Sequence, residues 1–380
     1  MKTENKKIKI IVISAVSILL ALAVFLTCFA LFSKKTVMKY DSYRITEDMY
    51  QYWLSDYKQK ILRDYPDVRD SEAFWTSPTA TGISYEEHFT NIIDVYVKRK
   101  LSASVLFDSL GYKLSSEART EIENILTENI EYVSGGDKEK FETVLSKYGI
   151  DYNGYKNTLI YDYKELYLYS LLYGSGSSGV SAEELNEFFN SFYFRVKIII
   201  IRTDFDYERN SDSSPKTDEN GEYIKKYYTE AESKEKKDTI SEMKALTDAG
   251  KMNEETFDQY YNNDNRDWNA GAYPNGYYLS SYSEYDKQIK NLVFGMNINE
   301  IKYLDFDNGK YTCFIKRYAN VENDYSSDEY KDSEWFDNFY SNAAQYIYYK
   351  LLDSYAENIT VYPNVKGKFL LRNVKANKDI

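Results

Sequence analysis

The chain has 380 residues, a formal net charge of −12 at pH 7 and a hydrophobic fraction of 43%. That much apolar material excludes a globally disordered chain, and the length predicts two or three domains. The negative charge argues against nucleic-acid binding, which needs a basic face. With only Cys28 and Cys313, a disulfide framework within the body and a cysteine-rich metal site are excluded as well.

Tyrosine dominates the composition, with 41 residues, whereas proline has only 5. Tyrosine side chains provide large amphipathic contact areas, which suits the binding of unfolded peptide. An AT-rich coding bias is the alternative interpretation, because Asn, Lys and Ile are also abundant.

Residues 10–32 carry no charge and are long enough to cross a bilayer as one helix. Four lysines precede them within residues 1–9, so the positive-inside rule predicts a cytoplasmic tail there and an extracytoplasmic body after the anchor. A cleaved signal peptide and a lipoprotein modified at Cys28 are the alternatives. All three interpretations place the body outside the cytoplasm.

A helical block is predicted for residues 36–192. An extended arm over residues 37–45 leads to Thr46, a candidate N-cap, and residues 64–82 are predicted to be a loop. Capping boxes open two helices, at residues 84–87 and 181–184. The predicted helices are residues 46–62, 84–110, 116–133, 138–147, 152–172 and 181–192, with a Gly/Ser linker at 174–179.

The hydrophobic period changes in the next block, residues 193–320. Residues 195–201 form a continuous β-branched run, which is typical of a strand buried on both faces. A polar, mobile insertion is predicted at residues 205–232. The remaining predicted elements are helices at 233–249, 254–261 and 287–294, and strands at 301–306 and 311–318 joined by an Asn308-Gly309 turn.

The last block, residues 321–380, contains a helix predicted at 333–357 and extended segments predicted at 359–374. We expect this helix to pack on the helical block. The fold class is therefore α+β multidomain: an N-terminal transmembrane helix, an all-α domain, an α+β domain and a C-terminal helix.

Several local features resemble the SurA/PrsA group of extracytoplasmic foldases. In the helical block they are Ile45-Thr46-Glu47-Asp48, Leu110-Gly111-Tyr112, Lys147-Tyr148-Gly149-Ile150 and Val180-Ser181-Ala182-Glu183-Glu184-Leu185. In the next block the run from Arg195 to Ile200, Gly271, Phe294, Met296 and Asp307-Asn308-Gly309 are similar to a parvulin-type prolyl isomerase. The resemblance implies a SurA-like chaperone domain over 36–192 and a parvulin-like domain over 193–320.

The parvulin-like block departs from its family at the catalytic positions. The family places one His on the first strand and another on the last, and these positions are Ile198 and either Tyr311 or Cys313 here. The acidic or Cys position falls at Asp264 or Asn265, and the aromatic floor position at Ile289. Because the chain has a single histidine, His88 in the helical block, the paired-His arrangement is excluded. Phe294 and Met296 could keep part of the apolar floor.

The resemblance implies a membrane-anchored, extracytoplasmic chaperone that binds unfolded or newly secreted polypeptides. An active peptidyl-prolyl isomerase of the same architecture and a surface interaction or adhesion protein remain alternatives, and the oligomeric state is open. No residue is assigned as catalytic. The candidate peptide-binding residues are Tyr161, Tyr163, Tyr167, Phe336 and Phe339.

No cofactor or metal is predicted. His88 has no second histidine to share a metal with, and the acidic residues of the insertion lack EF-hand spacing.

Overall fold

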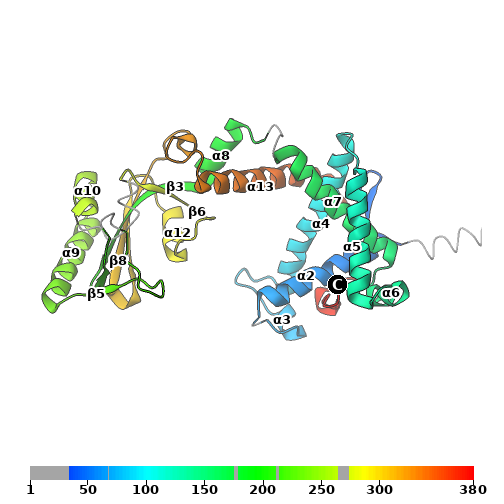
Figure 1. Ribbon diagram of the computed structural model, residues 1–380. Helices are drawn as coiled ribbons and strands as arrows, with labels where there is room; N and C mark the ends of the chain where they lie inside the picture. Colours follow the sequence, from blue (N-terminus) through cyan, green and yellow to red (C-terminus); the bar gives the residue numbers. More distant parts are fainter. Residues whose placement is uncertain (1–33, 67, 175–178, 211–213, 264–273) are drawn as a thin grey trace, which may run out of the picture. The chain divides into compact units, whose positions relative to one another are not determined.

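The computed structural model describes residues 34–66, 68–174, 179–210, 214–263 and 274–380 (Figure 1). The chain forms two compact units. Met1–Gly179 and Tyr346–Ile380 make the first unit, and Val180–Gln345 make the second. The predicted anchor at residues 10–32 lies outside the described residues. Within the part of the chain that is described, no helix is long and apolar enough to cross a membrane.

The first unit is mainly helical and includes a small antiparallel sheet with strand order β2-β1-β9. Its strands are β1 (Thr36–Tyr40), β2 (Tyr43–Thr46) and β9 (Thr360–Val361). Its helices are α2 (Glu47–Asp64), α3 (Glu72–Thr76), α4 (Tyr85–Ser109), α5 (Ser116–Ser134), α6 (Lys138–Ser146), α7 (Tyr152–Tyr173), the end of α13 (Glu334–Ala356) and α14 (Pro363–Lys366).

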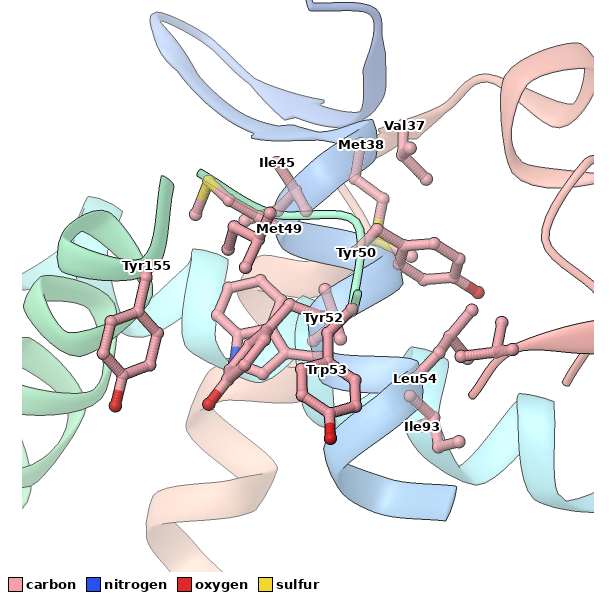
Figure 2. Packing of buried hydrophobic residues seen from close by; sticks show 14 of the residues in the cluster. Val37, Met38, Ile45, Met49, Tyr50, Tyr52, Trp53, Leu54, Ile93 and Tyr155 are labelled. Carbon is pink, nitrogen blue, oxygen red and sulfur yellow. The ribbon is translucent and has the colours of Figure 1, made fainter. Parts of the chain in front are cut away.

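The core of the first unit forms around α2. Figure 2 shows Val37, Met38 and Ile45 of the hairpin beside α2, with Tyr155 contributed by α7. Side chains on nearly every side of α2 are buried, because the hairpin, α4 and α7 all pack against it. This explains why α2 carries aromatic residues on several of its sides.

The C-terminal segment is bound to the first unit by hydrogen bonds to buried side chains. The Lys58 Nζ donates to the Val374 carbonyl at 2.8 Å, and the Tyr148 hydroxyl donates to Asp379 at 2.7 Å. The buried Lys58 also pairs with Asp70 at 2.7 Å, so its charge is compensated. This segment therefore completes the first unit although it is far from it in sequence.

The second unit is built on a four-stranded antiparallel sheet with order β6-β3-β8-β7. Its strands are β6 (Tyr277–Ser280), β3 (Tyr193–Arg202), β8 (Tyr311–Tyr318) and β7 (Ile301–Phe306). Helices α9 (Glu230–Asp248) and α10 (Glu254–Asn263) cover one face, and α12 (Lys287–Phe294) covers the other (Figure 1). Helix α8 (Ala182–Phe192) precedes β3.

Strand β3 is buried on both faces, as its β-branched run predicts. Ile199 and Ile201 pack with the residues of α9 and α10, whereas Val196 and Ile198 pack with those of α12. This alternation follows from the two-residue period of a strand. The predictions of β3, α12, β7 and β8 are confirmed, and in the connection after β7 both Asn308 and Gly309 have positive φ, as the Asn-Gly signal requires.

The structure corrects four local predictions. Of the capping box predicted at residues 84–87, the structure shows one half, in which the Ser84 hydroxyl accepts a hydrogen bond from the Glu87 amide. The loop predicted at 64–82 contains α3, whose N-cap Ser71 accepts a hydrogen bond from the Phe74 amide. The extended segment predicted at 359–374 is a strand only at β9, because Pro363 then opens α14. The insertion predicted to be mobile at 205–232 contains β4 (Phe205–Tyr207) and β5 (Lys225–Tyr227), which pair antiparallel, and α9 begins within it.

The division into units also differs from the predicted domain bounds of 36–192, 193–320 and 321–380. Helix α8 belongs to the second unit, because Phe188 and Phe189 pack on Tyr278 and Phe339, with Phe189 and Tyr278 only 4.8 Å apart. Residues 321–345 belong there too, and the remainder of the C-terminal block belongs to the first unit.

Candidate functional site

The α12 face of the sheet brings together most of the residues that the sequence resemblance assigns to parvulin functional positions. Ile198 of β3, Cys313 of β8, and Ile289 and Met296 from and after α12 are buried in one cluster, and Tyr311 packs against it. Phe294 lies nearby, with its ring 5.1 Å from that of Phe194. The other two positions, Asp264 and Asn265, lie outside the described residues.

The described side chains on this face are mostly apolar and buried, so they lack the exposed acid and base groups of a catalytic site. Ile198 is 0% exposed and Cys313 1%, so neither side chain can contact a bound peptide without a rearrangement. Tyr311 is half-buried and stacks on Phe306 at 5.0 Å, and burial raises the pKa of its hydroxyl. The Tyr277 and Tyr285 hydroxyls, 3.1 Å apart, are hydrogen-bonded to each other.

The sequence candidates on α7 point mainly into the first unit. Tyr163 is buried, and the ring of Tyr161 packs edge-on against Trp53 at 6.2 Å while its hydroxyl donates to the Arg44 carbonyl at 3.2 Å. Tyr167 stacks on Tyr163 at 6.0 Å and is half-buried. The three residues therefore serve mainly as packing groups.

Of the two candidates on α13, Phe339 is unavailable to a ligand. It is 0% exposed and stacks on Trp335 at 5.5 Å within the second unit. Phe336 is half-buried and lies 6.1 Å from the Phe339 ring. Only Phe336 of this pair keeps surface that a peptide could reach.

A different set of residues places aromatic and apolar groups at the surface of the first unit. On α7, Leu166, Tyr169 and Tyr173 follow one another at i, i+3 and i+7, so they share one side of the helix. Leu166 is 60% exposed, and the two tyrosines are half-buried. Both tyrosine rings contact the ring of Tyr348, at 5.3 and 6.0 Å.

This region continues onto α4 through Tyr349. The Tyr349 ring lies 6.0 Å from that of Tyr348, and the Arg99 guanidinium sits 4.2 Å above it. One and two turns before Arg99 on the same side of α4, Val95 and Ile92 are exposed. We call this region the tyrosine surface: Ile92, Val95, Arg99, Leu166, Tyr169, Tyr173 and Tyr349.

A buried cation next to the tyrosine surface links α4 to α7. The Lys100 Nζ forms ion pairs with Asp162 and, at 3.1 Å, with Glu165, and lies 4.3 Å from the ring of Tyr96. Burial opposes the charge on Lys100, but the two carboxylates outweigh it and raise the pKa of the amine above its usual value. Lys100 therefore stays charged and ties α4 to α7.

Sequence reasoning missed most of the tyrosine surface. The i, i+3, i+7 spacing of Leu166, Tyr169 and Tyr173 could have marked one side of α7. It could not have shown that this side stays accessible, because the core side of α7 is equally rich in tyrosine. Tyr349 gave no separate signal, since it lies in a run of apolar and aromatic residues.

The first unit also contains a polar pocket of about 720 Å³ between the β1–β2 hairpin and α7. Arg44, Met49, Asn157 and Tyr161 are among its lining residues. Lys34, which also lines it, pairs with Asp48 at 2.5 Å and with Asp151 at 2.7 Å. No group of acidic, His or Cys residues that could hold a metal occurs among the residues described.

No protein-family model matches the chain, and no curated protein matches it. Its structural neighbours are PrsA foldases. PrsA from Bacillus subtilis is 14% identical, with 79% of this chain and 93% of that chain covered and a TM-score of 0.22. The peptidylprolyl isomerase PrsA from Bacillus cereus is 14% identical, with 76% and 93% covered and a TM-score of 0.25. The foldase PrsA from Streptococcus pneumoniae is 14% identical, with 82% and 93% covered and a TM-score of 0.20. With TM-scores this low, we draw on the chain's own contacts for function.

Proposed function

We propose that this protein is an extracytoplasmic chaperone that binds unfolded or newly exported polypeptides at the tyrosine surface. The observation that carries the proposal is the grouping of exposed aliphatic residues, Ile92, Val95 and Leu166, with half-buried tyrosines on the first unit. Contiguous apolar groups at a surface are typical of interaction sites. Tyrosine adds hydrogen-bonding hydroxyls, so the surface suits peptides of varied sequence.

The tyrosine surface combines adaptable contacts with a rigid support. Arg99 forms a two-point ion pair with Asp353, at 2.7 and 2.8 Å, and Lys100 ties α4 to α7 beneath the rings. A peptide therefore meets a surface in which the ion-paired Arg99 guanidinium holds the Tyr349 ring, 4.2 Å away. Preorganisation of this kind lowers the entropy lost on binding.

We further propose that the second unit does not accelerate prolyl isomerisation. The reaction crosses a barrier of about 18–20 kcal/mol without breaking a bond, and an enzyme lowers it by binding the twisted amide. Ile198 and either Tyr311 or Cys313 stand where the resemblance expects imidazoles; Ile198 and Cys313 are buried and Tyr311 is half-buried. The uncharged segment at 10–32 would tether the protein to the membrane, with the body outside.

The test uses the full chain and two readouts. The first is suppression of aggregation of a chemically unfolded protein, and the second is cis/trans exchange of an Ala-Pro peptide by NMR. We expect suppression without acceleration. In the double variant Leu166→Ser/Val95→Ser, suppression should weaken several-fold.

Tyr132→Ser is the matched control, because Tyr132 is 87% exposed on α5 and lies outside the tyrosine surface. The chaperone proposal fails if the wild-type chain leaves aggregation unchanged, or if the double variant acts like the wild type. Saturable acceleration of exchange would overturn the statement on isomerisation and favour an enzyme.

A further inference from the structure

Between β3 and α9, residues 205–210 and 214–227 form a β-structure with its own aromatic side. Strands β4 and β5 pair in the register Phe205↔Tyr227 and Tyr207↔Lys225. Beyond them, bridges join Arg209 to Pro215 and Thr217 to Tyr223, and the Lys216 amide donates to the Glu208 carbonyl at 2.7 Å. The side chains of this segment therefore have fixed directions.

Four rings lie in contact along one side of this segment. Phe205 is 5.3 Å from Tyr207 and 5.9 Å from Tyr227, and Tyr207 is 5.4 Å from Tyr223. Phe205 is buried, whereas Tyr223 is 56% exposed and Tyr227 70% exposed. We call these four residues the aromatic strip.

The aromatic strip is joined to the main sheet by one arginine. The Arg202 guanidinium lies 3.9 Å from the ring of Phe205 and 4.9 Å from the ring of Tyr311. Asp204 holds it by two hydrogen bonds, of 3.1 and 3.3 Å. Tyr311 also packs against the cluster on the α12 face. Contacts through Tyr311 and Arg202 therefore connect that face to the aromatic strip.

The ring side of the segment carries a lysine, Lys225, in a chain whose net charge is −12. The Lys225 Nζ lies 4.9 Å from the Phe205 ring and makes no ion pair with any described residue. Asp206 and Glu208 alternate with the rings along the chain, so they point to the opposite side. Both acidic residues are also ion-paired, Asp206 with Arg209 at 3.7 Å and Glu208 with Lys216 at 3.5 Å, so Lys225 stays available to an acidic group of a ligand.

Hairpin stability explains only part of this arrangement. A cross-strand aromatic pair such as Phe205 and Tyr227 stabilises two paired strands. Tyr223 and Tyr227 nevertheless leave more than half of their surface in solvent, so both rings keep area that a ligand can contact.

We propose that the aromatic strip binds extended polypeptide segments that carry both acidic and aromatic side chains. This rests on the proposed function and names a class of client sequence for it. Acidic groups complement Lys225, and aromatic side chains stack on Tyr223 and Tyr227. The ladder of β4 and β5 has two strands only, so an extended segment can also pair with its outer edge.

A polypeptide fits this surface better than a lipid bilayer. The strip carries few cations and no large aliphatic side chain, whereas attachment to an anionic membrane draws on several basic residues together with buried apolar groups. Its continuity with Tyr311 and the α12 face also suits a long, narrow ligand.

The test measures fluorescence anisotropy of two labelled twelve-residue peptides with the full chain. One peptide alternates Glu and Phe, and the other alternates Lys and Phe. We expect the Glu/Phe peptide to bind about tenfold more tightly at low salt, with the preference shrinking as salt screens Lys225. In Tyr223→Ser/Tyr227→Ser the affinity for it should fall about tenfold.

Tyr132→Ser is again the control and should bind like the wild type. Lys225→Glu is a second variant that leaves every ring in place, and it should abolish the preference for the acidic peptide. Circular dichroism of each variant checks that the fold is retained.

Equal affinity of the wild type for the two peptides, or unchanged binding by the double variant, would overturn the proposal. So would strip-dependent binding to phosphatidylglycerol vesicles or to a soluble acidic polysaccharide without binding to the Glu/Phe peptide. Aggregation suppression separates the two proposals: if it persists in a chain that shows no preference between peptides, the chaperone function stands and the strip assignment fails.

Discussion

The tyrosine surface of the first unit and the α12 face of the second are built from similar residues and differ in burial. Both combine aromatic rings with aliphatic side chains. On the tyrosine surface, Leu166 and Val95 face solvent beside half-buried tyrosines. On the α12 face, Ile198, Cys313 and Met296 are buried in the core of a sheet. The comparison teaches that the solvent accessibility of the side chains, more than their composition, separates the proposed binding surface from a packed core.

The two regions also differ in their charged groups. Lys100, beneath the tyrosine surface, pairs with two carboxylates, and Arg99 pairs with Asp353. The cluster on the α12 face consists mainly of packed apolar side chains, and a hydrogen bond joins the Tyr277 and Tyr285 hydroxyls beside it. The first region therefore depends on electrostatics that pH can change, whereas the second depends on packing.

The largest expected effect tests whether a ring belongs to a core or to a surface. Phe339→Ala should lower the unfolding free energy of the second unit by about 3–5 kcal/mol, because it removes a fully buried ring. Phe336→Ala, one turn earlier and half-buried, should cost roughly 1 kcal/mol. Urea denaturation followed by tryptophan fluorescence measures both, since Trp335 stacks on Phe339. Equal costs would mean that Phe339 is not part of a packed core.

A somewhat smaller effect is expected for an imidazole placed on the α12 face. Ile198→His should cost about 2–4 kcal/mol, because the polar ring replaces a fully buried aliphatic side chain among apolar neighbours. It should not produce isomerase activity. Ile198→Val is the matched control, at about 1 kcal/mol. A stable, active Ile198→His chain would show that this face opens to a substrate.

Alkaline pH should destabilise the first unit. Burial raises the pKa of Tyr50, Tyr52 and Tyr348 in the folded state, and the carboxylates around Lys100 raise the pKa of its amine. Above about pH 10 the unfolded chain releases these protons first, so the unfolding free energy falls as pH rises. Each group contributes a slope of about 1.4 kcal/mol per pH unit there.

Denaturant titrations at pH 8, 9.5 and 11, followed by circular dichroism, measure this dependence. A double variant Tyr50→Phe/Tyr348→Phe should show a shallower decline, because two of the titrating hydroxyls are gone. An unfolding free energy that stays constant up to pH 11 would contradict the burial of these tyrosines.

The smallest expected effect concerns the rim of the tyrosine surface. Arg99→Ala should lower stability by about 1 kcal/mol, since the ion pair with Asp353 is partly exposed and the guanidinium also stacks on Tyr349. Arg99→Lys keeps the charge but loses the planar two-point contact, so it should recover only part of this. Thermal unfolding of the three chains decides the order, and an Arg99→Lys chain as stable as the wild type would rule out a role for the planar geometry.

Local sequence signals predicted most of the second unit. The β-branched run before Arg202 fixed β3, and Asn308-Gly309 marked the connection between β7 and β8. The Ser181 capping box marked the start of α8, and both of its hydrogen bonds are present. These signals succeed because they act within a few residues, where backbone sterics and capping dominate.

The unit boundaries escaped prediction because they depend on distant partners. Helix α8 joined the second unit through rings more than 80 residues away, on Tyr278 and Phe339. The folded β-structure of residues 205–210 and 214–227 was missed although Phe205 and Tyr207 alternate with acidic residues, because β4 and β5 have only three residues each and the residues between them are mostly polar.

By itself, the sequence determined β3, β7, β8 and most of the long helices, and it excluded a pair of histidines, since these follow from residue identity and local backbone preference. Only the tertiary structure decided which tyrosine side chains are buried in a core and which reach the surface. Tyr163 and Tyr169 lie on the same helix and have the same chemistry, yet one is buried and the other reaches the surface. The reason is physical: the side of α7 that is covered is set by the helices that pack on it from elsewhere in the chain.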